Sequence, residues 1–359
     1  MRMAPNVTSK SLLRAMRAFL CVALLAWATD EVAHAQASGT NVSKAGTTSA
    51  VFLEIPVGAR AIGMGGAFVG TANDVSSLYW NVAGLATLPR NEALFTHNEW
   101  LADTRFDYAA LAVPIEPLGT LGLSFTSLSM DDMLVHTVER PEGTGELFSA
   151  GSFAVGVHYA RYLSETFSIG FTAKYISERI WNMQAQAFAL DVGTLFVTNF
   201  LNGMRIGAQI SNFGTDMKLE GRDTRTFHPI DPNKLGSNDR IPQTIEMDSW
   251  HLPLHFQFGI ALDPLKTDEH LLTVGVDALH PSDNYESLNV GIEYGFKRTF
   301  YVRGGYRSLF LQDREGGLSL GAGVLASLFG NHIEGRFDYA FQDFGRLKSV
   351  HVLAVSVLF

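Results

Sequence analysis

Apolar and polar residues alternate in one segment after another from Glu92 to the end of the chain. Alternation with a period of two places successive side chains on opposite faces of a β-strand. In Leu288–Phe296 one face carries Leu288, Val290, Ile292, Tyr294 and Phe296, and the other carries Asn289, Gly291, Glu293 and Gly295. A soluble sandwich would bury the first face and expose the second to water. Here the charges and glycines share one side in nearly every segment, and an apolar exterior around a polar interior is typical of a membrane barrel.

About fourteen such segments follow one another, an even number, as in bacterial outer-membrane barrels. We therefore expect an all-β fold, a transmembrane outer-membrane β-barrel of about fourteen antiparallel strands. The mean hydropathy of +0.10 is low for a protein built from membrane helices. The expected strands are 92–100, 105–114, 119–129, 151–162, 166–181, 184–198, 203–213, 253–262, 269–280, 286–296, 298–308, 317–328, 331–341 and 348–359.

The lengths of the connections predict the orientation of the barrel. Two long connections, Met130–Ala150 and Gly214–Leu252, both follow odd-numbered strands, whereas short turns such as Leu163–Glu165 follow even-numbered ones. Outer-membrane barrels have short periplasmic turns and longer outer loops. Both chain termini are therefore expected in the periplasm.

The run 316–333 lacks Asp, Glu, Lys and Arg and is long enough to suggest a membrane helix. Its apolar residues fall on alternate positions with serine and glycine between them, and glycine is costly in a helix. We therefore expect a strand. The same run holds Gly317-Leu318-Ser319-Leu320-Gly321, a Gly-x-Ser-x-Gly nucleophile pattern that would need a strand-to-helix turn. A strand explains these residues better than a catalytic serine does.

The first 35 residues have the features of a secretory signal peptide. Four basic residues precede an apolar run from Ala18 to Ala28, and Ala33-His34-Ala35 supplies a cleavage site. Cleavage after Ala35 would remove the only cysteine, Cys21, which leaves no disulfide and no thiolate metal site. It would also change the net charge from -9 to -11, since 27 - 4 = 23 basic residues remain against 36 - 2 = 34 acidic ones. Such a charge argues against a nucleic-acid partner.

The stretch Val51–Arg90 does not alternate and is rich in glycine. Glycines with small neighbours allow tight turns and close approach of backbones, which a segment inside another structure requires. We expect residues 36–91 to form a lead-in and an N-terminal plug, and residues 92–359 to form the barrel around it.

This stretch also carries a family resemblance, in Gly58-Ala59-Arg60-Ala61, Gly63-Met64-Gly65-Gly66-Ala67, Asn73-Asp74 and Trp80-Asn81-Val82-Ala83-Gly84-Leu85. It resembles the plug of the PorV/PorQ family of outer-membrane proteins, relatives of the FadL transporters. Val82 stands where those proteins usually carry proline. The resemblance continues through His97–Asp103 and Lys174–Arg179. It implies that the plug motif consists of Gly58, Arg60, Gly63, Gly65, Gly66, Asp74, Trp80, Asn81 and Gly84.

Charged residues of both signs are expected on the inner face of the barrel. Because charges facing a filled interior must be paired, we expect them to pair across the barrel or to hold the plug, and an ion pathway is the alternative. These residues are Lys174, Asp191, Arg205, Asp277, Glu293, Arg303, Arg307, Glu334, Arg336 and Asp338.

Other motifs give no convincing site. His251 and His255 have zinc-helix spacing, but Pro253 lies between them. Gly63–Gly66 lacks the strand and the third glycine of a dinucleotide loop. Asp231, Asn233 and Gly236 begin like a calcium loop, but Leu235 and Pro242 occupy two ligand positions. We expect no enzymatic activity and no cofactor or metal, with calcium in the outer loops left open.

The resemblance leaves two functions open. The PorV side implies an accessory of type IX secretion or surface-protein export that binds secretion components or exported proteins at its outer loops. The FadL side implies an outer-membrane transporter of hydrophobic small molecules. The loop Gly214–Leu252 mixes several charges with a few apolar residues, a composition that suits a protein partner, and therefore favours the first function. Outer-membrane lipid surrounds the barrel in either case.

Overall fold

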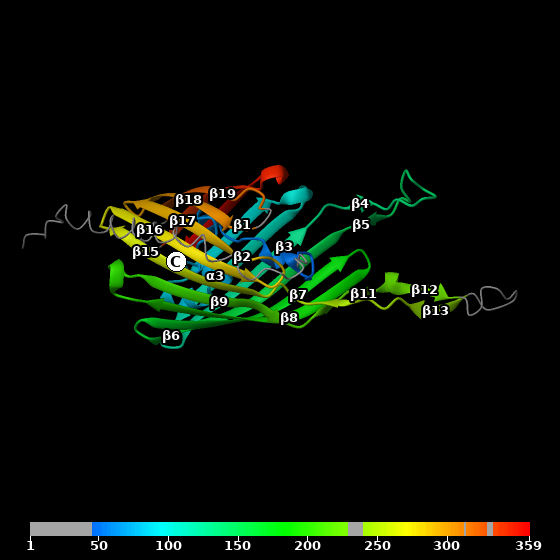
Figure 1. Cartoon of the computed structure of the whole chain (residues 1–359), viewed down its shortest axis with the longest axis horizontal. Coiled ribbons are helices and arrows are strands. Elements are labelled where there is room, and N and C mark those ends of the chain that lie inside the picture. The colour runs from blue at the N-terminus through cyan, green and yellow to red at the C-terminus, as the bar shows by residue number, and fades with distance from the viewer. Residues whose placement is uncertain (1–44, 229–239, 312–313, 329–332) are drawn as a thin grey trace, which may run out of the picture. The chain divides into compact units, whose positions relative to one another are not determined.

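The computed structural model describes residues 45–228, 240–311, 314–328 and 333–359. Within them, fourteen long antiparallel strands form a closed barrel (Figure 1). The barrel strands are β1 (Glu92–Glu99), β2 (Arg105–Ile115), β3 (Gly119–Ser129), β6 (Ala150–Ser164), β7 (Phe167–Ile180), β8 (Met183–Val197), β9 (Arg205–Gly214), β15 (His255–Lys266), β16 (His270–Pro281), β17 (Ser287–Phe296), β18 (Phe300–Leu309), β19 (Leu318–Ser327), β20 (Glu334–Asp343) and β21 (Ser349–Leu358).

Every barrel strand pairs with the strands before and after it, and β1 closes the ring against β21, with Glu92 opposite Leu358. The predicted fourteen-stranded barrel is confirmed. The largest difference in strand limits is at β15, expected to end at Leu262 but continuing to Lys266. A shift in register between Leu262 and Leu265 explains the difference, because a bulge breaks the alternation from which the end of the strand was read.

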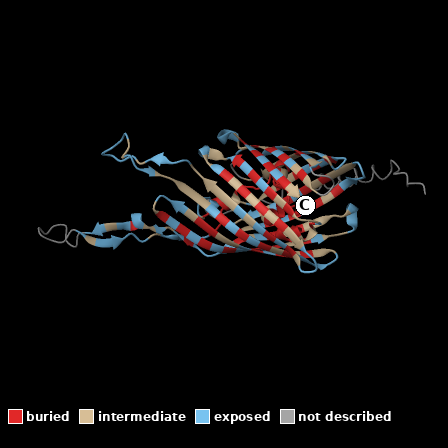
Figure 2. Ribbon diagram, turned by 180° about the vertical axis from the view of Figure 1, so that it is seen from behind, coloured by how far each residue is buried: buried red, intermediate tan, exposed pale blue. Residues whose placement is uncertain are grey.

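The two faces of the strands differ as the alternation predicts. In β17 the side chain of Ile292 is 44% exposed and points out of the barrel, while Glu293 beside it is 1% exposed. Figure 2 shows buried and exposed residues alternating in this way along the barrel strands. The strand predicted in place of a helix at 316–333 is also confirmed over β19, and Ser319 is buried as the second residue of that strand, with a strand and not a helix following it. Residues 329–332 lie outside the described residues.

The two long connections leave the same end of the barrel (Figure 1). The first contains the hairpin of β4 (Met133–Leu134) and β5 (Leu147–Phe148), and the second contains β12 (Arg225–His228) paired with β13 (Ile241–Thr244). The second connection also forms β10 (Met217–Lys218) with β14 (Ser249–Trp250), and β11 (Glu220–Gly221), which pairs with β8. Single turns of 3-10 helix occur at η3 (Leu101–Asp103), η4 (Phe200–Asn202), η5 (Arg222–Thr224) and η6 (Gly345–Leu347).

Residues 45–91, here called the N-terminal segment, contain only short helices: η1 (Val51–Glu54), α2 (Ala59–Gly63), α3 (Ser77–Trp80) and η2 (Val82–Thr87). Most side chains between Phe52 and Leu85 are buried. None of the helices in the described ranges has the length and the apolar character that crossing a membrane requires. The predicted signal peptide and the candidate calcium ligands Asp231, Asn233 and Gly236 lie outside the described residues.

Candidate functional site in the barrel lumen

The N-terminal segment packs backbone to backbone against the inner face of the barrel. The Cα of Gly321 on β19 lies so near Gly63 that a Cβ on Gly63 would be 3.0 Å from it. Gly65 has φ +65°, and a Cβ there would lie 2.6 Å from the backbone nitrogen of Tyr306 on β18. Any larger residue at Gly65 would both strain the backbone and collide with the wall. The glycines of the motif thus allow the segment to fit against the strands.

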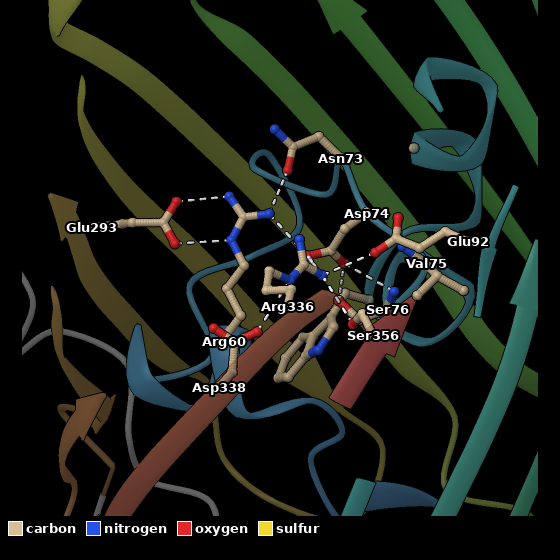
Figure 3. A network of polar contacts seen from close by, with 12 residues as sticks. Arg60, Asn73, Asp74, Val75, Ser76, Glu92, Glu293, Arg336, Asp338 and Ser356 are labelled. Carbon is tan, nitrogen blue, oxygen red and sulfur yellow. Dashed lines mark hydrogen bonds and ion pairs between the residues drawn. The ribbon is translucent and has the colours of Figure 1, made fainter. Parts of the chain in front are cut away.

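Arg60, on α2, joins this segment to the barrel wall (Figure 3). Its guanidinium makes a bidentate ion pair with Glu293 of β17, with Nε to Oε2 at 2.8 Å and Nη2 to Oε1 at 2.7 Å. Its Nη1 also donates to Asn73 at 2.7 Å and to Asp74 at 2.8 Å. A planar guanidinium with several donors suits this arrangement, because a lysine could not make the bidentate pair.

Two arginines of the wall extend the network. Arg336 of β20 donates through Nη2 to Asp74 and to Glu92, each at 3.0 Å. Arg303 of β18 donates through Nε to Glu293 at 2.6 Å and through Nη1 to Asp338 of β20 at 2.6 Å. Three guanidiniums and four carboxylates therefore form one continuous buried cluster. We call it the lumen ion network; its members are Arg60, Asp74, Glu92, Glu293, Arg303, Arg336 and Asp338.

The charges of the N-terminal segment are stabilised by this cluster. Burial alone would raise the pKa of Asp74, but Arg336 and Arg60 hold that pKa well below its usual range. Burial would lower the pKa of Arg60, yet Glu293 and Asp74 raise it well above its ordinary value. Both groups are therefore ionised at any physiological pH, as the pairing prediction requires.

Hydrogen bonds outside the lumen ion network complete the attachment. Asp277 of β16 accepts hydrogen bonds from the backbone nitrogens of Phe68 at 2.7 Å and Val69 at 2.8 Å. Asn81 donates through Nδ2 to the carbonyl oxygens of Val69 and of Thr194 on β8, each at 3.0 Å.

Contacts within the segment involve the remaining motif residues. Trp80 donates through Nε1 to the carbonyl oxygen of Val57 at 2.9 Å, and its ring lies beside Gly66. Gly58 starts α2 with φ +79°, and Gly84 packs against the backbone of Ala72. All nine predicted motif residues thus lie in one buried assembly with the inner wall.

Four of the other predicted lumen charges, Lys174, Asp191, Arg205 and Glu334, lie in separate pairs. Within the described residues Asp277 and Arg307 have no ion pair, so the pairing prediction does not hold for these two. Lys174 pairs with Asp191 at 2.9 Å, and Glu334 pairs with Arg90. Arg205 binds Asp263 through two bonds of 2.8 Å. Sequence reasoning missed Asp263 because the predicted strand stopped at Leu262. It missed Glu92 because the alternation does not show on which face of the strand a carboxylate at the first position lies.

A cavity of about 140 Å³ lies between the N-terminal segment and the barrel wall. Phe52, Leu78, Tyr79 and Trp80 line it from the segment. The wall contributes Tyr108, His158, Lys174, Asp191, Gln209, Asn212, His255, Gln257, Asn289 and Arg307, among others. The cavity therefore has an aromatic side and a polar side. No pattern in the sequence indicated it, because its lining comes from α3, η1 and many strands.

Comparison with known proteins supports the fold. A family model described as "Uncharacterised protein family (UPF0164)" matches residues 28–174. The toluene transporter TbuX of Ralstonia pickettii aligns over 84% of this chain and 97% of its own, with 12% identity and a TM-score of 0.52. The toluene transporter TodX of Pseudomonas putida aligns over 84% and 97%, with 11% identity and a TM-score of 0.50. The chain is a bacterial outer-membrane β-barrel. No curated protein matches its sequence.

The localisation and fold class predicted from the sequence are thereby confirmed for this outer-membrane barrel. A Pseudomonas aeruginosa FadL homologue also aligns with it, over 84% of this chain and 98% of its own, at 10% identity and a TM-score of 0.49. The narrower resemblance to the PorV/PorQ family stays a prediction. Among the described residues no group of three or more His, Cys, Asp or Glu side chains is placed to hold a metal ion.

Proposed function

We propose that this barrel carries small hydrophobic molecules across the outer membrane and that the N-terminal segment acts as its plug. The observation that supports the proposal is the cavity, which lies inside the barrel and is bounded by the segment on one side and the wall on the other. Binding sites for small molecules are commonly concave and aromatic, with a few polar groups that fix orientation.

The size and lining of the cavity define the class of solute. A cavity of about 150 Å³ lined by apolar side chains holds one benzene molecule. The cavity here is about 140 Å³, with Phe52, Tyr79 and Trp80 in its lining. A single aromatic or alicyclic ring is therefore the expected size of one bound solute. TbuX and TodX, which share the fold, are toluene transporters by description.

Uptake of radiolabelled toluene by cells that lack other such transporters tests the proposal. Cells carrying the barrel should take up toluene faster than cells without it. Ala154→Phe, which fills the cavity from β6, should abolish the gain. Ala173→Phe is the matched control, because Ala173 is exposed on the outer face of β7. Equal uptake by the wild type and the Ala154→Phe variant, both assembled, would contradict the cavity as the route.

A second candidate is the accessory role in type IX secretion or surface-protein export. The two hairpins at one end of the barrel support it, since Val138 of the first connection and Phe227 of β12 are exposed apolar residues. The cavity leads us to place transport first, although the loop composition alone favoured protein binding. Shortening Gly221–Arg240 should leave toluene uptake unchanged. If this variant lost the surface proteins that co-purify with the wild type, and shortening Met133–Phe148 did not, the result would favour the secretion role.

A further inference from the structure

Arg307 differs from the three arginines of the lumen ion network. It lies on β18, its side chain lines the cavity, and it is half-buried. Within the residues that the structure describes, its guanidinium makes no ion pair and no hydrogen bond, whereas Arg60 and Arg303 each bind two carboxylates and Arg336 binds three. A guanidinium away from bulk water is costly unless an anion pairs with it.

The other basic and imidazole groups in the lining have partners. Lys174 is bound to Asp191. The ring of His158 is hydrogen-bonded on both nitrogens, to Ser124 and Thr172, each at 2.8 Å. His255 is hydrogen-bonded to Gln257 at 2.9 Å. Arg307 is therefore the one cation of the described lining whose charge is available to a ligand.

Glu54 is the acid that could compete for Arg307. It also lines the cavity and makes no hydrogen bond or ion pair with its side chain in the described part of the chain. Burial raises the pKa of Glu54 to about 7, with help from Asp283 and against the attraction of Arg307. Near neutral pH a large fraction of Glu54 is uncharged, so it leaves the positive charge of Arg307 incompletely balanced.

We propose that the cavity binds a small organic anion, with its carboxylate on the guanidinium of Arg307 and its ring among Phe52, Tyr79 and Trp80. The inference rests on the proposed function and narrows its substrate class from neutral hydrocarbons to ring compounds with one acidic group. Arginine and a carboxylate form two parallel charge-assisted hydrogen bonds, which a neutral ring compound cannot provide.

Equilibrium dialysis of the full barrel in lipid nanodiscs tests this inference, with empty nanodiscs to correct for partition into lipid. The probes are benzoate and benzamide, which match in size and differ in charge. The wild type should bind benzoate at least about tenfold more tightly than benzamide, the ratio that about 1.4 kcal/mol gives. Arg307→Gln should abolish this preference and keep benzamide binding. Arg307→Lys should retain part of the preference, and Arg105→Gln, at an exposed arginine away from the cavity, should retain all of it.

Each result of the dialysis experiment either supports or overturns the anion site at Arg307. Equal affinity of the wild type for benzoate and benzamide would overturn the inference, even with toluene uptake established. This comparison uses the wild type alone and so does not depend on the folding of any variant. A benzoate preference that survives in assembled Arg307→Gln would overturn it as well. An Arg307-dependent preference without toluene uptake would sustain the anion site and refute only the transport of neutral hydrocarbons.

Discussion

Replacing Arg60 by leucine removes one of the two charged residues, with Asp74, through which the N-terminal segment binds the wall members of the lumen ion network. The change deletes two hydrogen bonds to Glu293, one to Asn73 and one to Asp74. Both carboxylates keep one other guanidinium, since Glu293 stays with Arg303 at 2.6 Å and Asp74 stays with Arg336 at 3.0 Å.

The magnitude follows from burial and from these remaining partners. Removing one member of a buried ion pair costs about 3–5 kcal/mol, because the other charge is left uncompensated. Since neither Glu293 nor Asp74 is left alone, we expect the lower end, about 3 kcal/mol. The attachment of the segment loses the two bonds to Glu293, which join α2 to β17, while the bonds to Asn73 and Asp74 lie within the segment.

Urea unfolding of the barrel in detergent, followed by heat-modifiable gel mobility, measures the stability. Conductance in planar bilayers reports whether the segment still blocks the lumen. Arg60→Leu should lower the unfolding midpoint and raise the conductance. Arg105→Leu, which breaks an exposed pair with Asp131, should cost about 0–1 kcal/mol and leave the conductance unchanged. If Arg60→Leu behaved like Arg105→Leu on both measurements, the assignment of Arg60 as an attachment point would be wrong.

Three further predictions concern the segment, the wall and the pH. Deleting residues 51–90 should leave a barrel that assembles and has a higher conductance in planar bilayers than the wild type. An unchanged conductance would mean that this stretch does not block the lumen. Ile292→Arg places a charge on the outer face and should cost about 2–4 kcal/mol near the bilayer midplane, against little for Ile292→Leu, as scored by the heat-modifiable fraction. Because the pKa of Glu54 rises on folding from its usual 4.5 to about 7, its contribution to stability is complete below pH 4.5 and is lost as the pH passes 7. In Glu54→Gln the unfolding midpoint should depend less on pH over that range. An unaltered dependence on pH would show that Glu54 is not its source.

Strand number and sidedness could be predicted from the sequence because they depend on a local pattern. In β17 each residue from Leu288 to Phe296 lies on the predicted face, since alternation is a property of neighbouring residues. The limits of β15 were less accurate because the bulge after Leu262 interrupts the alternation, so the pattern stops there although the strand continues.

Pairing inside the lumen could not be predicted in the same way. Arg60 and Glu293 are 233 residues apart, and they meet only because the register of the strands brings β17 next to α2. The sequence indicated charges of both signs, but which of them pair depends on registers that hydropathy does not determine. The cavity and the unpaired Arg307 are consequences of the same three-dimensional arrangement.

The lumen ion network also lies across the seam where the first and last strands of the barrel, β1 and β21, meet. Arg336 on β20 reaches Glu92 on β1 and Ser356 on β21, and the same Nη2 binds Asp74 of the N-terminal segment. Pairing of β1 with β21 joins residues more than 200 positions apart, and contacts of such separation form late in folding because the loop they close is long. Contacts of the N-terminal segment with the wall span similar separations, 262 positions between Asp74 and Arg336, so they belong to the same late stage of folding. A ring closed without the segment would leave Arg336 without one of its carboxylates, so the segment stabilises the seam of the barrel as well as filling its lumen.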